Sequence, residues 1–309
     1  MSEQGLRVVL LAALGALGFY FSAVFVAGLR KVNSASGGHV RPSLKEIVTG
    51  FITVFFDTLG IGSFATTTAI FRAWRLVPDE LLPGTLNVGH TIESVLSAFV
   101  FISVVPVEAG TLIPMVAASA IGAWLGSGIV AGLPRHRIRL GMGIALIVAA
   151  SMMLMTQLRL VPSGADALGL DWPLLGVAIA GNFIFGALMT LGIGLYAPCM
   201  IMVSLLGLNP KAAFPIMMGS CAGLMPMAAA RFVKAGRYHP SAAVGLTVGG
   251  IPALFIAAYL VKSLPLGAVR WLVIVVVVYT AVTLIRAGLR ELSGTPERPV
   301  ISNPTASVP

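Results

Sequence analysis

Charged side chains are scarce in this sequence. Lysine, arginine, aspartate and glutamate make up 10% of its 309 residues, whereas hydrophobic residues make up 57%. A soluble domain carries roughly 25% charged residues on its surface, so this composition excludes a water-facing globule. Apolar runs recur as far as Ile285 and leave no stretch large enough for a soluble domain. We therefore expect a single integral membrane domain over residues 1–309.

Cysteines and catalytic motifs are lacking as well. Two cysteines inside apolar segments, Cys199 and Cys221, exclude a disulfide framework, and no Cys/His spacing fits a zinc site. The sequence contains no His-Glu-x-x-His, no phosphate-binding loop and no Gly-x-Ser-x-Gly. We expect no metal, no cofactor and no enzymatic activity. The net charge of +9 comes from basic residues in short loops, which indicates membrane orientation and not nucleic-acid binding.

Two of the apolar runs have an unusual length. The runs 47–75 and 173–206 are too long to cross a core of about 30 Å once and too short to cross it twice. Each has a glycine-rich interruption near its middle, at 57–62 and 190–194. The other runs have ordinary lengths and lie at 6–29, 84–104, 111–132, 140–157, 214–230, 241–261 and 271–285.

The two interruptions are copies of one motif. Shifting the chain by 132 residues superposes Thr58-Leu59-Gly60-Ile61-Gly62 on Thr190-Leu191-Gly192-Ile193-Gly194, and Pro83 on Pro215. After a one-residue slip, Leu133-Pro134 matches Leu264-Pro265. A duplication is therefore predicted. Its parts are an N-terminal helix and loop at 6–46, repeat 1 at 47–157, repeat 2 at 173–285, and a C-terminal tail at 286–309 that is disordered after 292.

The distribution of basic residues favours re-entrant hairpins. If all nine runs crossed once, the 20 lysines and arginines would divide 11 inside to 9 outside. If 47–75 and 173–206 instead return to the side they entered, the division is 15 to 5, as the positive-inside rule requires. The predicted fold is an all-α polytopic membrane protein in which an N-terminal helix precedes two inverted-topology repeats. Each repeat has a broken re-entrant hairpin and three transmembrane helices, with the N-terminus outside and the C-terminus cytoplasmic.

Inverted repeats with broken helices indicate a secondary transporter. The first turn of a helix presents unpaired N–H groups, and glycine lets a ligand approach the backbone, so two such starts aimed at one point predict an anion site. The alternative is that the glycines kink helices for packing and the threonines bond to their own carbonyls. The predicted binding residues near the breaks and in the following helix are Gly60, Gly62, Thr66, Thr67, Gly192, Gly194, Cys199 and Ser220.

Polar and acidic side chains mark the run 84–104. Asn87 and His90 share one face of it, and such a face in a membrane helix contacts a cavity or a partner helix. We predict that both line the site. Asp57 at the first break and Glu93 one turn from His90 are candidates for exchanging a coupling proton. The alternative for these carboxyl groups is a hydrogen-bonded cap on the broken backbone.

The duplicated Gly-x-Gly segments, Gly60 to Pro83 and Gly192 to Cys221, resemble the sulfite exporter TauE/SafE family. The likeness covers most of residues 47–285 and is strongest from Gly194 to Cys199 and from Pro215 to Cys221. Thr66 stands in the first copy where the second has Pro198. The resemblance implies export of sulfite, sulfoacetate or a related sulfonate across the cytoplasmic membrane without ATP.

Both lines of argument lead to one expected function. It is a secondary transporter that exports a small organosulfur anion by alternating access, in contact with membrane lipid and without nucleic acid, with proton coupling as a possibility. The alternative is an anion channel or a membrane scaffold without a transport cycle. Monomer and homodimer both remain open.

Overall fold

The computed structural model describes residues 2–37, 39–58, 62–130, 132–160, 167–192, 194–260 and 266–293. Those residues form helices and contain no β-strand. The elements are α1 (Glu3–Ser36), α2 (Leu44–Thr58), α3 (Ser63–Trp74), η1 (Asp79–Leu81), α4 (Leu82–Val104), α5 (Ala109–Val130), α6 (Arg135–Gln157), α7 (Leu174–Met189), α8 (Tyr196–Leu205), η2 (Pro210–Ala212), α9 (Ala213–Lys234), α10 (Pro240–Leu260) and α11 (Leu266–Leu292).

Six of the described helices are long and apolar enough to cross a membrane: α1, α4 with η1 before it, α5, α6, α9 and α10. The expectation of an all-helical membrane protein is therefore confirmed. Two helices are longer than predicted: α1 continues to Ser36, beyond the predicted end at 29, and α11 continues to Leu292, beyond the predicted end at 285. The predicted disorder after 292 concerns residues that lie, except for Ser293, outside the described ranges.

Both long runs are divided into two helices. The first run forms α2 and α3, of 15 and 12 residues, and the second forms α7 and α8, of 16 and 10 residues. At 1.5 Å per residue the longest of these, α7, measures about 24 Å, which is less than the thickness of a bilayer core. None of the four helices therefore has the length of a full crossing.

Glycine accounts for both breaks. Gly62 has φ +88° and Gly192 has φ +92°, which are values that side chains on Cβ disfavour. The α-helical ladder cannot continue through such a residue, so the chain turns and a new helix begins at Ser63 and at Tyr196. Gly60, Ile61 and Ile193 lie outside the described residues.

The helices pack in matching pairs. α2 packs along α10 and α5 along α7, while α4 packs on α9 and α6 on α11. Small residues allow the backbones to touch: a Cβ added to Gly249 of α10 would lie 2.0 Å from the Ile47 carbonyl oxygen, and one added to Gly122 of α5 would lie 2.0 Å from that of Phe183. Such glycine contacts are typical of helix association in membranes.

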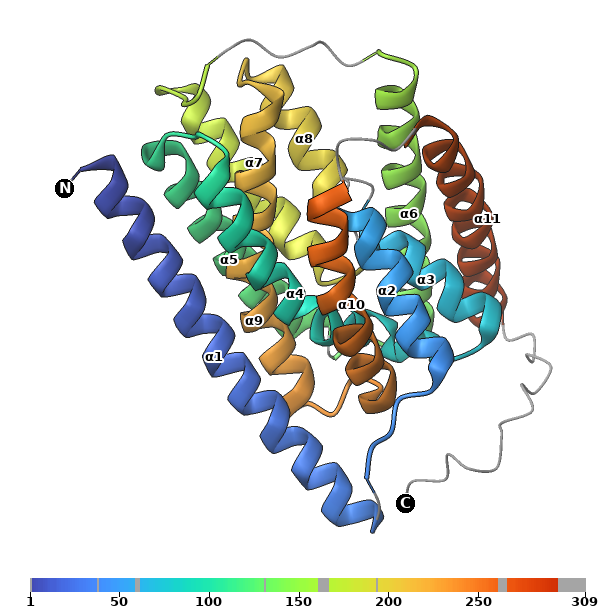
Figure 1. Cartoon of the computed structure of the whole chain (residues 1–309). Helices are drawn as coiled ribbons and strands as arrows, with labels where there is room; N and C mark the ends of the chain where they lie inside the picture. The colour runs from blue at the N-terminus through green and yellow to red at the C-terminus, as the bar shows by residue number, and fades with distance from the viewer. Residues whose placement is uncertain are drawn as a thin grey trace.

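Connecting segments gather at two opposite ends of the molecule. At one end, Arg237 donates to the Leu133 carbonyl (3.2 Å) and Ser241 to the Arg41 carbonyl (3.0 Å). At the other end, the Asn209 N–H donates to the Ala167 carbonyl at 2.8 Å. Figure 1 shows α2 and α3 reaching the lower end, where α1 also terminates, and α7 and α8 reaching the upper end. The two broken runs thus lie toward opposite ends of the molecule, and residues next to both breaks line one interior cavity.

Candidate functional site

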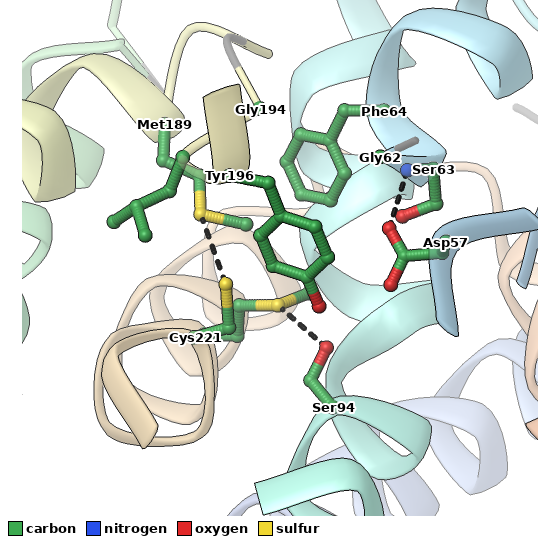
Figure 2. Close-up of a pocket in the computed structure, with 11 residues that line it drawn as sticks. Asp57, Gly62, Ser63, Phe64, Ser94, Met189, Gly194, Tyr196 and Cys221 are labelled. Atoms are coloured by element: carbon green, nitrogen blue, oxygen red, sulfur yellow. Dashed lines mark hydrogen bonds between the residues drawn. The ribbon is translucent and has the colours of Figure 1, made fainter. Parts of the chain in front are cut away.

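A cavity lies where the two breaks meet. It is lined by Asp57, Gly62, Ser63, Phe64, Ser94, Met189, Gly194, Leu195, Tyr196, Cys221 and Met225. Its volume of about 10 Å³ is room for about one water molecule. Figure 2 shows Phe64 and Tyr196 lying side by side across it, with Asp57 on one flank and Met189 and Cys221 on the other.

Asp57 caps the start of α3. Its side chain is 3% exposed, and Oδ1 accepts a hydrogen bond from the Ser63 backbone N–H (Figure 2). A carboxylate at a helix start satisfies an unpaired N–H and interacts favourably with the helix dipole. The anion-binding position predicted at this break is therefore already held by a side chain of the protein itself.

The start of α8 differs from the start of α3. Leu195 precedes α8 and no side chain caps the helix. A Cβ added to Gly194 would meet nothing within 4 Å, and the same holds for Gly62 before α3, so the two starts differ in their cap and not in the open space beside them. The Tyr196 hydroxyl donates to Met218 Sδ at 2.7 Å. This start keeps its N–H groups available to a ligand.

A buried polar cluster on α4 lies behind the cavity. His90 and Glu93 are no more than 1% exposed, and Nδ1 of His90 lies 3.3 Å from Oε1 of Glu93. His90 Nε2 is hydrogen-bonded to the Thr67 hydroxyl of α3 at 3.1 Å. Two ionisable groups are thus held next to each other in the interior, where a charge without a counter-charge is costly.

A second polar contact joins α7 to its neighbours. The Asn182 amide donates to the Met115 carbonyl and to the Ser220 hydroxyl, both at 2.7 Å. Asn182 is fully buried and cannot bond to bulk water, so the carbonyl and the hydroxyl are the partners that its amide hydrogens need.

We expect Asn182→Ala to lower the stability by about 1 kcal/mol, because interhelical hydrogen bonds in membranes contribute about that much. Thermal unfolding in detergent measures the change. Ser127→Ala on α5 is the control, since its hydroxyl bonds only to the Trp124 carbonyl in its own helix. Equal midpoints for the two variants would show that the Asn182 bonds contribute nothing.

The predicted site residues fall into three groups: those that line the cavity, those in the polar cluster next to it, and those that belong to neither. Asp57, Gly62 and Gly194 line it, and Thr67, His90 and Glu93 form the adjoining polar cluster. The others do not line it and have different surroundings; they are Thr66, Asn87, Gly192, Cys199 and Ser220. The hydroxyl of Thr66 bonds to the Ser63 carbonyl, as the packing alternative anticipated. Gly60 lies outside the described residues.

Several lining residues were missed by the sequence argument. They are Ser63, Phe64, Ser94, Met189, Leu195, Tyr196, Cys221 and Met225. The duplication itself was the available signal, because lining residues occur 132 apart: Asp57 with Met189, and Phe64 with Tyr196. Gly62 with Gly194 has the same spacing. Both members of each pair line the same cavity.

The chemical character of the lining is mixed. It has one carboxyl group, three hydroxyl groups and three sulfur atoms, and no described lining residue is lysine or arginine. No group of three His, Cys, Asp or Glu side chains gathers as a metal site within the described ranges. What the cavity offers to a solute is hydroxyls, backbone N–H groups and a soft apolar wall.

Comparison with known proteins found no match for this chain among protein-family models, curated proteins or solved structures.

Proposed function

We propose that this protein is a secondary transporter that exports a small organosulfur anion, such as sulfite or sulfoacetate, across the cell membrane. The observation that carries the proposal is the small interior cavity that is lined by residues next to both helix breaks. Broken helices meeting at the membrane midplane are the usual binding site of such carriers. The substrate class follows from the resemblance to the sulfite exporter TauE/SafE family.

Matching contacts support two inverted repeats. Gly50 of α2 touches the backbone of Leu246 on α10, and Asn182 of α7 bonds to the carbonyl of Met115 on α5. Asn182 follows Gly50 by 132 residues and Leu246 follows Met115 by 131, the two offsets found in the sequence. Equivalent residues of the two halves thus make equivalent contacts, which a two-fold relation requires.

The position of the connecting segments supports the proposed orientation. The segment around Arg237 is hydrogen-bonded to the segment around Leu133, and Ser241 shortly after it is hydrogen-bonded to Arg41. These segments lie at the lower end of the molecule in Figure 1. They belong to the basic loops that lie in the cytoplasm if the two long runs are re-entrant hairpins. The N-terminus is then outside and the C-terminus cytoplasmic.

The uncapped start of α8 is the better of the two helix starts for the anion. Gly194 leaves space there, and the hydroxyls of Ser94 and Tyr196 line the same cavity. At α3 an anion would compete with the Asp57 carboxylate for the Ser63 N–H. A proton taken up by Asp57 would relieve that competition, which gives a physical reason for coupling transport to protons.

The size of the cavity favours a carrier over a channel. Room for about one water is too little for sulfite, so the site has to expand when it takes up the substrate. A carrier passes through such closed states in each cycle, whereas an open channel has a continuous path.

The proposal is tested by thermal unfolding of the purified protein with sulfite, sulfate, sulfoacetate, taurine, acetate and bicarbonate. A ligand at a hundred times its dissociation constant adds about 2.7 kcal/mol, so a true substrate should raise the midpoint clearly. We expect sulfite or sulfoacetate to do so, and Gly194→Leu to abolish the shift by filling the open space.

Gly110→Leu is the matched control, because Gly110 also has nothing within 4 Å but lies near the beginning of α5, away from the cavity lining. It should keep the shift. A flat response of the parent protein across the panel would remove the anion assignment, and neutral or cationic solutes would be tried next.

A further inference from the structure

Three buried sulfur atoms line the cavity. Cys221 and Met225 belong to α9, and Met189 is the last residue of α7. Residues four apart share one face of a helix, so α9 presents a thiol and a thioether to the same space. Figure 2 shows the sulfur atoms of Met189 and Cys221 pointing toward each other. Two helices from different parts of the bundle thus bring sulfur ligands to one point.

Hydrogen bonds show how these sulfur atoms are placed. The Cys221 thiol donates a weak hydrogen bond to Met189 Sδ, and the two sulfur atoms are 3.9 Å apart. The Ser94 hydroxyl donates to Met225 Sδ at 3.1 Å. A thioether sulfur has two lone pairs, and Ser94 uses one of those on Met225. Each methionine can therefore act as a ligand without leaving its position.

The kind of ligand indicates the kind of metal ion. Thiolate and thioether sulfurs are soft ligands that select copper(I), whereas magnesium and calcium ions take oxygen ligands. Zinc sites use several cysteine, histidine or carboxylate ligands, and no group of three such residues gathers anywhere in the part of the chain that the structure describes. One thiol with two thioethers thus fits a soft monovalent ion better than a divalent one.

The spacing of the sulfur atoms fits one shared ion. Two sulfurs that each lie about 2.3 Å from a metal ion are about 4.0 Å apart in a trigonal site and about 3.8 Å apart in a tetrahedral one. The 3.9 Å between Cys221 and Met189 falls between these values. The cavity volume of about 10 Å³ also suits a single ion, whereas sulfite requires the cavity to expand.

Charge balance favours such an ion in the membrane interior. When a monovalent ion binds, the S–H bond of Cys221 breaks, a sulfur–metal bond forms, and the proton leaves to solvent. One positive charge replaces another, so the interior gains no net charge, which would be costly there. Asp57 on the opposite flank adds a carboxyl group, and no described lining residue is a lysine or arginine that would repel a cation.

We propose that Cys221, Met189 and Met225 form a binding site for one soft monovalent metal ion, with copper(I) as the biological ion. The metal takes the place of the proton that now lies between Cys221 and Met189. This inference goes beyond the proposed function and does not depend on it. It also departs from the sequence-based expectation of no metal, which considered the spacing of cysteine and histidine and left methionine aside.

The test is a titration of the purified protein in detergent with silver(I). Silver(I) shares the preference of copper(I) for sulfur and is stable in air, and a chloride-free buffer keeps it in solution. Isothermal titration calorimetry measures the affinity and the number of ions bound, and a pH electrode in weak buffer measures the protons released. We expect one ion per protein and one proton released per ion.

The two cysteines provide a matched pair of variants. Cys221→Ser replaces the sulfur with an oxygen of similar size, so it should abolish both the stoichiometric binding and the proton release. Cys199→Ser is the control, because Cys199 is also buried and free but does not line the cavity. It should bind silver(I) like the parent protein.

Methionine variants test the thioether ligands. Met189→Leu and Met225→Leu keep an apolar side chain of similar size and remove the sulfur. Each should weaken silver(I) binding by at least about tenfold, since changes that only touch the neighbours of metal ligands already cost 10–100-fold. Met217→Leu is the control, because Met217 is buried on the same helix without lining the cavity. If Cys221→Ser does not fold, these variants still decide the question.

Three results would overturn the inference. They are a parent protein that does not bind silver(I), an affinity that Cys221→Ser or both methionine variants leave unchanged, and an equal loss in Cys199→Ser. Silver(I) binding in a protein that sulfite does not stabilise would support the metal site and count against the proposed substrate. Stabilisation by sulfite in a protein that does not bind silver(I) would do the reverse.

Discussion

Gly249→Leu is expected to leave almost no folded protein after extraction into detergent. The Cβ of any replacement would lie 2.0 Å from the Ile47 carbonyl oxygen and 2.7 Å from the Phe51 backbone nitrogen. These are backbone atoms in the middle of α2, so α2 and α10 would have to separate along their length. Overpacking of a core costs about 1–3 kcal/mol where side chains can yield, and we expect more here because they cannot. Size-exclusion profiles and the thermal midpoint measure the loss.

The same substitution at Gly110 provides the comparison. A Cβ there would meet nothing within 4 Å, so Gly110→Leu should elute and unfold like the parent protein. Gly249→Ala should fall between the two, because it adds only one of the four carbon atoms. A Gly249→Leu variant with the parent's midpoint would show that α2 and α10 do not pack as described.

Asp57 variants are expected to have the largest effect on transport. Asparagine can still accept the Ser63 N–H bond but carries no charge, so Asp57→Asn should fold and yet lose the dependence of transport on the proton gradient. Its rate should fall by roughly tenfold or more, equivalent to about 1.4 kcal/mol at the barrier. Asp57→Ala should in addition lose about 1 kcal/mol of stability, because the cap is gone. Uptake into proteoliposomes at several pH values, with the anion that stabilises the protein, measures both.

Glu108→Gln is the control, since Glu108 lies in the segment before α5 and not in the cavity. It should transport like the parent. If Asp57→Asn transports with the parent's pH profile, Asp57 has no coupling role and acts only as the cap of α3. The Asn and Ala variants together therefore separate charge from helix capping.

The breaks were predictable from the sequence, whereas the partners of their residues were not. Gly62 and Gly192 stand out because their duplicated pattern interrupts two runs of unsuitable length. The sequence analysis gave a cap on the broken backbone as the alternative role of Asp57, but it did not identify the N–H of Ser63, six residues later, as the partner, since that contact needs the particular turn that the break makes. Thr66, by contrast, bonds to the carbonyl of Ser63 in its own helix, as the packing alternative anticipated.

Tyr196 and Cys221 illustrate the remaining difference. Both sit in apolar stretches that read as ordinary core, and only the packing of α8 on α9 brings them to the cavity with Asp57. Asn182 likewise looks isolated in an apolar run until α5 and α9 close around it.

By itself, the sequence determines that this protein is helical and membrane-embedded, and where two of its runs are interrupted, because hydrophobic length and glycine act locally along the chain. Tertiary packing decides which helix start keeps its N–H groups free and which side chains face the cavity. Those properties depend on contacts between residues more than a hundred positions apart, such as Ser94 with Met225, and no local pattern encodes them.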